Sequence, residues 1–475
     1  MNANQSIQTP TRPIGATKVG RRAAWLAVVL LGFSSFAGAQ TISEAYRQAL
    51  QHDPVLESAH HAMEAAKEKL PQARAGLLPS VQATFGTNTQ RGEVSFSDAP
   101  YLSRDARTRS WSLQLTQPLF RLGNWVALDQ ADAQVRQAEA AYAQAQQELI
   151  LRVAQAYFDV LVAEESLEVA QVQLAAVEQQ LALAKRNFDV GTSTISDTYE
   201  SKARLDLASS QHIGAMHVLS SKRAEYARIT GEEPHALLML EADKDLPKPE
   251  PADLAAWIAT ARENHPSVRL QQAVQEVAKK EIARARAAHA PTIDLTASHG
   301  GNKAAGSLLS PADIDTRSRS NQIGIQINIP IFSGGATESR VRESVANYHK
   351  ARADVDAAGR QALMAARLAF NAFDSGKSLI TALKAAVQSS ISALEASKIG
   401  YRTGTRINID VLNAQQQLAT ARRDLVKARY ETLMEGLKLK AAAGVLAEQD
   451  IYQIDAMMIR KAPGHIPNQG RIFVH

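Results

Sequence analysis

The chain has 475 residues, no cysteine and a formal net charge of +5. The lack of cysteine excludes disulfides and thiolate metal sites. Four of the 53 basic residues lie in residues 1–39, which contain no acid, so the rest of the chain holds 49 basic residues against 48 acidic ones. This near-neutral balance gives no electrostatic support for binding to nucleic acid.

Residues 1–39 have the composition of a secretory signal. A basic lead at 12–22 precedes an apolar run at 23–31, and small residues at 37–39 suit cleavage before Gln40. The apolar run is far shorter than the roughly 20 residues of a membrane-spanning helix, so we predict a signal peptide and not an anchor. No later segment is apolar enough for such a helix, and a membrane-embedded part would have to consist of strands.

The mature chain begins with a helical segment at 42–75, interrupted by prolines. From 79–87 the apolar period becomes alternating, as in a strand, and after a polar stretch at 88–107 it resumes at 111–116. Pro118 follows directly, where we expect the second strand to turn into a helix, because proline needs no backbone donor there.

A long helix is expected from Trp125 to Val190, which are separated by no glycine or proline. Apolar residues recur in it every seven positions, at Val153, Val160, Leu167, Leu174, Leu181 and Phe188. A strict seven-residue repeat predicts a left-handed supercoil with neighbouring helices. Gly191 can close this helix as a left-handed residue, and a second helix is expected over about 194–229.

The whole arrangement occurs twice. Shifting the heptad positions by 213 residues gives Ala366, Phe373, Ile380, Val387, Leu394 and Tyr401. The same comparison pairs Gly191 with Gly404 and Asp197 with Asp410, and a shift of 212 pairs Pro118 with Pro330. We therefore predict two structural repeats, each ordered helix–strand–strand–helix–helix.

These repeats set the predicted domain boundaries. The first repeat covers 40–231 and the second 254–444. The proline-rich segment 232–253 is expected to be a linker packed on the surface. Residues 445–475 are expected to form a C-terminal tail with little periodicity, on the periplasmic side.

The alternating runs of the second repeat are clearest at 293–298 and 323–329. A run of about 8 to 12 residues suits a strand that crosses an outer membrane with lipid on one side and water on the other. A half-buried sheet of a soluble protein alternates in the same way. Four strands cannot close a water-filled barrel, so membrane strands would require several chains to share one. The polar stretches 88–107 and 300–318 would then be loops on the side away from the helices.

Several segments resemble the TolC family of outer-membrane channels, which serve type I secretion and drug efflux. The resemblance covers the chain from Ile42 to about Asp450. It is carried by Leu77-Leu-Pro-Ser, Leu113-Gln-Leu-Thr-Gln-Pro-Leu-Phe, Ala156-Tyr-Phe-Asp-Val-Leu and Gly400-Tyr-Arg-Thr-Gly-Thr-Arg-Ile-Asn-Ile-Asp-Val-Leu-Asn.

The resemblance implies a mixed α/β membrane channel. Three identical chains would each give four strands to one twelve-stranded β-barrel in the outer membrane, surrounded by its lipid. The helices would continue this barrel as a long α-helical coiled-coil tunnel in the periplasm. At its tapered entrance such channels meet an inner-membrane ABC transporter or proton-driven pump and a periplasmic adaptor (membrane fusion) protein.

The resemblance also places functional residues at the entrance, in the hairpin turns at Gly191 and Gly404. Asp410 matches an acidic ring at the pore constriction. Asn413 stands where the family often has a second acid, so we expect a less negative constriction with weaker cation preference. Tyr401 and Arg406 match residues that latch the inner hairpin to its neighbour, and Ser196 and Asp197 match their partners.

Each of these residues also has a purely structural interpretation. Asp197 follows Thr194 by three residues and could complete a capping box. Asp410 lies in a first helical turn, where the helix dipole favours an acid. Tyr401 continues the heptad and could be a core residue.

Nothing in the sequence supports catalysis. It contains no phosphate-cradling glycine loop, no metalloprotease helix motif and no nucleophile elbow, and its histidines lack metal-ligand spacing. We therefore expect no enzyme, no cofactor and no metal.

The predicted function is export of substrates from the periplasmic side to the exterior, with a toxin-like protein of a type I system as the preferred cargo. A multidrug efflux outlet is the alternative within this class. A soluble periplasmic coiled-coil adaptor or scaffold is the alternative of another class; it explains the heptads and the duplication but not the alternating strands.

Overall fold

The computed structural model describes residues 39–95, 100–241, 244, 246–247, 250–308 and 314–460. The predicted signal, apart from Ala39, and residues 461–475 of the predicted tail lie outside this description. The described residues from Gln40 to Arg460 belong to one unit. Among the described helices, none combines the length and the apolar character needed to cross a bilayer.

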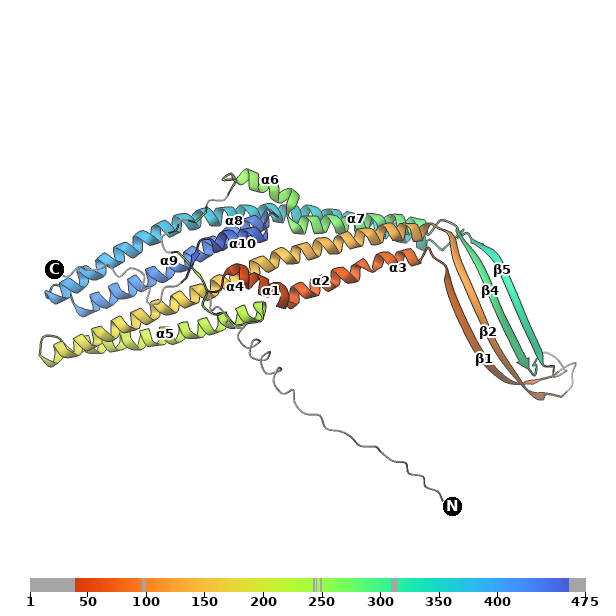
Figure 1. The fold of residues 1–475 in the computed structure, drawn as a ribbon, viewed down its shortest axis with the longest axis horizontal. Helices are drawn as coiled ribbons and strands as arrows, with labels where there is room; N and C mark the ends of the chain where they lie inside the picture. The colour runs from red at the N-terminus through yellow and green to blue at the C-terminus, as the bar shows by residue number, and fades with distance from the viewer. Residues whose placement is uncertain are drawn as a thin grey trace, which may run out of the picture. The chain divides into compact units, whose positions relative to one another are not determined.

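The order of elements repeats once along the chain (Figure 1). The first repeat contains α1 (Ile42–His52), α2 (Pro54–Lys67), α3 (Lys69–Ala75), β1 (Ser80–Val94), β2 (Leu102–Arg121), α4 (Leu122–Asp189) and α5 (Ile195–Thr230). The second contains α6 (Leu254–Asn264), α7 (Pro266–Ala287), β4 (Thr292–Ala305), β5 (Thr316–Asn328), α8 (Ala336–Arg402) and α9 (Asn408–Ala442). The two predicted structural repeats are therefore present, each with helices, two strands and two further helices.

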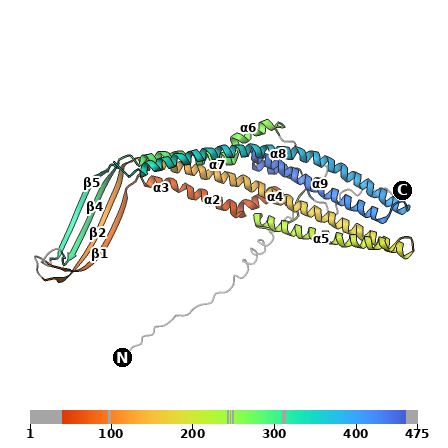
Figure 2. The ribbon, with the colours of Figure 1, turned by 180° about the vertical axis from the view of Figure 1, so that it is seen from behind.

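The long helices form two antiparallel hairpins, α4 with α5 and α8 with α9 (Figures 1 and 2). The predicted heptad explains the packing, because Val153, Val160 and Leu181 on α4 are all buried. Near the hairpin turn the same seam opens, and Phe188 keeps 42% of its surface exposed. The apolar stripe of α4 is therefore buried at Val153, Val160 and Leu181 and exposed to solvent at Phe188, next to the hairpin turn.

The four long strands make one antiparallel sheet in the order β1-β2-β4-β5. They are 15, 20, 14 and 13 residues long, longer than predicted. The expectation that 88–107 and 300–318 are loops is wrong for most of these residues, because the connections cover only 95–101 and 306–315. Polar side chains continue the ladder instead, as where Arg91 Nε lies 2.7 Å from Asp105 Oδ1 across the β1–β2 pair.

The predicted linker and tail contain structure that the sequence did not predict. β3 (Met239–Leu240), from the linker, pairs with β6 (Met458–Ile459), which follows α10 (Glu448–Asp455) in the tail. Leu240 and Ile451 are 2% and 0% exposed. Each such buried aliphatic side chain stabilises the fold by roughly 1.5–3 kcal/mol. These segments therefore form part of the main hydrophobic core, together with α1, the middle of α4 and the ends of α5 and α9.

Candidate functional site

The tips of the two helical hairpins are built alike. Gly191 and Gly404 have φ angles of 76° and 75°, a conformation that glycine adopts without strain. After α4 the amide of Thr192 donates to the carbonyl of Asn187 at 2.8 Å, and after α8 the amide of Thr405 donates to the carbonyl of Gly400 at 2.9 Å. Both turns therefore end their helix with a left-handed glycine.

Asp197 caps its own helix in this chain. Its carboxylate accepts from the amide and the hydroxyl of Thr194, both at 3.2 Å, and this completes a capping box at the start of α5. The neighbouring Ser196 is exposed. Within the chain, Asp197 therefore has the capping role that the sequence allowed for it. The Ser196 side of the same turn is open to solvent.

Arg406 is not brought to Asp197 within one chain. Its Nη1 lies 4.0 Å from Oδ2 of Asp410, one helical turn on, in a half-exposed pair. Asp410 also accepts from the amide of Ile407 at 3.3 Å. Tyr401 is partly buried, and its hydroxyl accepts from Nδ2 of Asn187 at 3.1 Å.

Asn413 is exposed, and its Oδ1 accepts from Nη2 of Arg204 on α5 at 2.8 Å. Asp410 and Asn413 thus each have an arginine beside them, Arg406 and Arg204. Both arginines reduce the negative potential at this end of the hairpins.

A buried asparagine joins the two hairpins, and our sequence reasoning missed it. Asn408 is 1% exposed; its Nδ2 donates to Oγ of Ser201 at 2.7 Å, and its Oδ1 accepts from Nε2 of Gln180 at 2.5 Å. The contact connects α9 to α4 and α5. The repeat itself carried a signal for it, because the equivalent position of the first repeat holds the apolar Ile195.

The two proline positions differ from each other. Pro118 lies inside β2 and not at its junction with α4, which is a correction to the prediction; the strand continues to Arg121. A register shift between Pro118 and Phe120 makes a bulge here, beyond the end of the β1 ladder at Thr116, and a residue without a backbone donor fits such a place. Pro330 does lie between β5 and α8.

The sheet has two chemically different faces, because successive strand residues point to opposite sides. One face is polar and neutral over its middle rows, with Gln82, Thr84, Ser112, Gln114, Ser298 and Gln322. The other face carries apolar side chains in the corresponding rows: Val81, Leu113, Ile323 and Ile325 are exposed, and Leu115 and Ala297 are partly exposed. Such a pattern is typical of a strand with water on one side and lipid on the other.

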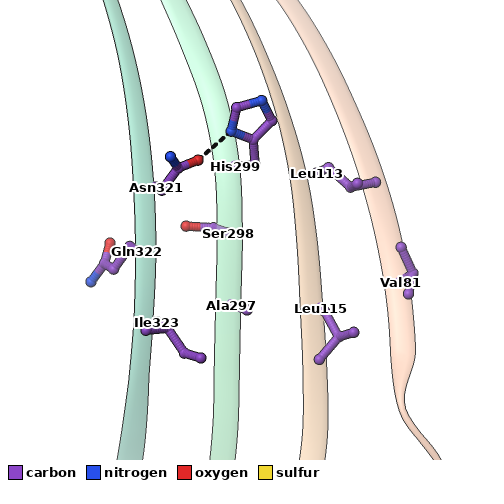
Figure 3. Close-up of a pocket in the computed structure, with 9 residues that line it drawn as sticks. All are labelled: Val81, Leu113, Leu115, Ala297, Ser298, His299, Asn321, Gln322 and Ile323. Atoms are coloured by element: carbon purple, nitrogen blue, oxygen red, sulfur yellow. Dashed lines mark hydrogen bonds between the residues drawn. The ribbon is translucent and has the colours of Figure 1, made fainter.

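Several residues of the apolar face line a shallow pocket together with His299 and Asn321, which are hydrogen-bonded to each other (Figure 3). An aromatic residue follows on the side towards the β1–β2 connection. The Trp111 ring meets the His299 ring edge-on at a centroid distance of 5.0 Å. It also lies over Gly301, where a Cβ atom would come within 2.7 Å of the indole Nε1.

Within the described ranges, no group of three or more histidine, aspartate or glutamate side chains is arranged to hold a metal ion. The polar contacts described above are helix caps, ion pairs, and hydrogen bonds between helices, within turns or between strands.

Comparison with known proteins gives one consistent result. The family model described as "Outer membrane efflux protein" matches residues 45–232 and again 257–445. The chain is 32% identical over 424 residues to Outer membrane protein TolC of Vibrio cholerae, covering 89% of this chain and 95% of that protein. It is 30% identical over 446 residues to Proteases secretion protein PrtF of Dickeya chrysanthemi, covering 92% and 95%.

A solved structure shows the same fold. The CmeC outer membrane channel of Campylobacter jejuni superposes with a TM-score of 0.72 at 17% sequence identity, covering 88% of this chain and 89% of that one. The match to the family model and to TolC proteins shows that the alternative of a soluble scaffold is wrong and that the chain is a non-enzymatic transport protein. The chain belongs to the TolC family of outer membrane efflux proteins and is an outer-membrane channel of the efflux and type I secretion class, extending into the periplasm.

Proposed function

We propose that three copies of this chain join their sheets into one twelve-stranded barrel and export a protein cargo of a type I secretion system. The observation that carries the trimer is the two-faced sheet with two open edges. β1 and β5 each pair on one side only among the described strands. Long open edges are normally paired or covered, and four strands cannot close a lumen, so the edges of neighbouring copies meet.

Partners must supply the energy for transport, because the sequence has no phosphate-cradling glycine loop. We assign that role to an inner-membrane ABC transporter, or to a proton-driven pump if the cargo is a drug. A periplasmic adaptor would connect the transporter to the hairpin tips.

The preference for protein cargo rests on the similarity to PrtF, whose name records secretion of proteases. The alternative, drug efflux, is favoured by the description of the family model. A strain lacking the gene separates the two when its secreted proteins and its drug susceptibility are scored together. Loss of one large protein from the medium with unchanged drug tolerance supports secretion. Greater drug sensitivity with an intact set of secreted proteins overturns it in favour of efflux.

At the entrance we propose that Asp410 and Asn413 face the pore constriction. Tyr401 and Arg406 would latch each inner hairpin to its neighbouring hairpin in the trimer, where Ser196 and Asp197 are their partners. The support is geometric: Ser196 and the Arg406 side chain are exposed at the tips, and the nearest carboxylate to Arg406 in its own chain is a half-exposed one at 4.0 Å. Such a pair is weak in water, about 0–1 kcal/mol, so Arg406 can exchange partners.

Asp410→Ala should raise single-channel conductance or lower cation selectivity in planar bilayers, because it removes the acid from the narrowest part of the pore. Asp424→Ala is the matched control: the residue lies two heptads further along α9, away from the tip. Conductance and selectivity equal to those of the parent channel would remove Asp410 from the constriction.

A further inference from the structure

We propose that a cluster of four basic residues on the apolar face of the sheet, Arg109, Lys303, Arg317 and Arg319, binds the phosphate groups of glycolipid headgroups in the outer leaflet of the membrane. This basic cluster rests on the proposed function, in which that face contacts lipid. Because the helices extend into the periplasm, the halves of the strands remote from the helices, where the cluster lies, face the exterior.

The strand register puts the basic cluster on one face. Arg109 of β2 is opposite Lys303 of β4, and Lys303 is opposite Arg317 of β5, so the three make one row across the sheet. Arg319 lies in the next row, which also contains Trp111. These residues alternate in step with the apolar residues of the same strands. Together with Trp111 and Phe85 they line an open pocket of about 880 Å³.

The row is not neutralised by the protein. Side chains directly opposite each other on adjacent strands have Cβ atoms about 5 Å apart, and like charges there are destabilising. None of the four side chains has an ion-pair partner within the described part of the chain. By contrast, Arg91 on the same face pairs with Asp105 at 2.7 Å. A row of cations without a carboxylate needs an anion from outside.

The opposite face does not share this charge. In the row that lies between the two levels of the cluster, it carries Gly86, Ser110, Asn302 and Ser318, all neutral. Cations that served the exported cargo or general solubility would be expected on the water-facing side. Their restriction to the apolar face connects them with lipid.

The depth of the basic cluster fits the edge of the membrane. From Ile293 to Lys303 strand β4 rises by about 34 Å, which a tilt of about 40° reduces to about 26 Å. The apolar band of outer-membrane barrels is about 25 Å tall and is bordered by aromatic residues. Trp111 supplies such a residue, and Arg109 lies two positions beyond it, about 7 Å further out. Headgroup phosphates lie at this level.

Arginine suits this ligand. Its planar guanidinium can donate two parallel hydrogen bonds to one phosphate, and its stem can lie along apolar surface while the charge reaches the polar layer. Three of the four residues of the basic cluster are arginines.

The experiment uses the full-length protein purified in detergent, with bisphosphorylated lipid A, the same lipid without phosphates, and inorganic phosphate as probes. Binding is measured by native mass spectrometry of the oligomer. The variant R109Q/K303Q/R317Q/R319Q should bind bisphosphorylated lipid A at least about tenfold more weakly than the parent, because several charge-assisted hydrogen bonds are lost. The matched control R352Q/R360Q/R367Q/K384Q removes the same charges from exposed positions of α8 and should bind like the parent.

Binding that is equal in the parent and the quadruple variant, or equal for lipid with and without phosphates, overturns the inference. Displacement of the lipid by millimolar inorganic phosphate would also overturn it, because the site would then take a free anion. If the quadruple variant fails to assemble, R109K/R317K/R319K, which keeps the charge but not the paired donors, should show an intermediate loss. The oligomer mass of the parent is read in the same spectra. A parent that is not trimeric defeats the proposed function, whereas a trimer indifferent to these residues defeats this inference alone.

Discussion

Asn408 is a buried polar residue that joins the two halves of the chain near the hairpin tips. It is almost fully buried, and it is hydrogen-bonded to side chains on α4 and α5 of the other hairpin. A buried asparagine in place of an apolar residue reduces the hydrophobic contribution but fixes which helices pair and in which register.

Asn408→Leu should lower the melting temperature of the helical part, because it leaves Gln180 and Ser201 buried without their partner. An unsatisfied buried polar group costs about 1–3 kcal/mol. Circular dichroism during heating in detergent measures the change. Ile195→Asn, at the equivalent and 43% exposed position of the first repeat, is the control and should change little. Similar melting of N408L and the parent would show that the hydrogen bonds of Asn408 do not hold the hairpins together.

His265 lies between α6 and α7, and its Nδ1 accepts from the amide of Ser267 at 3.2 Å. Burial lowers the pKa of this imidazole below its ordinary value of 6.5, because the charged form loses hydration. The unfolded chain therefore binds the proton more readily than the folded one. The stability contribution is complete above pH 6.5 and is lost as the pH falls through the folded value.

His265→Asn keeps a capping side chain at the start of α7 but does not titrate. The melting temperatures of the parent and this variant should run in parallel above neutral pH. Below it the parent should lose stability faster, since a protonated imidazole at a helix N-terminus also opposes the helix dipole. Parallel curves down to pH 5 would contradict this assignment.

At the scale of elements, the helices were more predictable than the connections. The predicted long helix, 125–190, agrees with α4 within three residues because its propensity and its heptad lead to the same result. The strands were underestimated, since polar ladders such as that of Arg91 and Asp105 lack apolar alternation. β3 and β6 are two residues each and owe their existence to a core built by distant helices, which no local pattern reveals.

Tyr157→Phe tests how firmly the linker is held. The hydroxyl of Tyr157 lies 2.9 Å from the carbonyl oxygen of Gln40 and 2.9 Å from that of Leu238, and its single proton is shared between them. Its removal leaves two buried carbonyls less satisfied and should cost about 1–2 kcal/mol. Limited proteolysis should therefore cut the variant faster within 232–253, whereas Tyr199→Phe, at a position 69% exposed, should not alter cleavage. Equal cleavage rates would mean that packing alone holds the linker.

At the scale of the whole molecule, the duplication could be read from the sequence because glycines, prolines and heptad residues keep one spacing in both halves. The residues that we propose for the entrance could be placed on the hairpin tips because Gly191 and Gly404 mark the ends of the long helices. The contacts of these residues could not be predicted, because Asp197 and Arg406 have partners within their own turns that compete with any partner elsewhere.

The proposed closure of the barrel can be tested directly, because the chain contains no cysteine. Thr87→Cys on β1, combined in turn with a cysteine at each of positions 316–320 on β5, should give disulfide-linked species of up to three chains on denaturing gels. Cysteines on β2 and β4 at the same level, Arg109→Cys with Lys303→Cys, should cross-link only within a chain. Dimers and trimers absent from every β1–β5 combination would rule out this pairing of edges.

The pairing of β2 with β4 joins segments that are far apart in time as well as in sequence. Trp111 pairs with Gly301, about 190 residues later in the chain. At a synthesis rate of 5–20 residues per second, roughly 10–40 s pass between the emergence of the two strands. During that interval one long edge of the first hairpin has no neighbour from its own chain, and such edges promote aggregation. Until the second half of the chain is present, native pairing of β2 with β4 therefore competes with pairing of the open β2 edge to another chain.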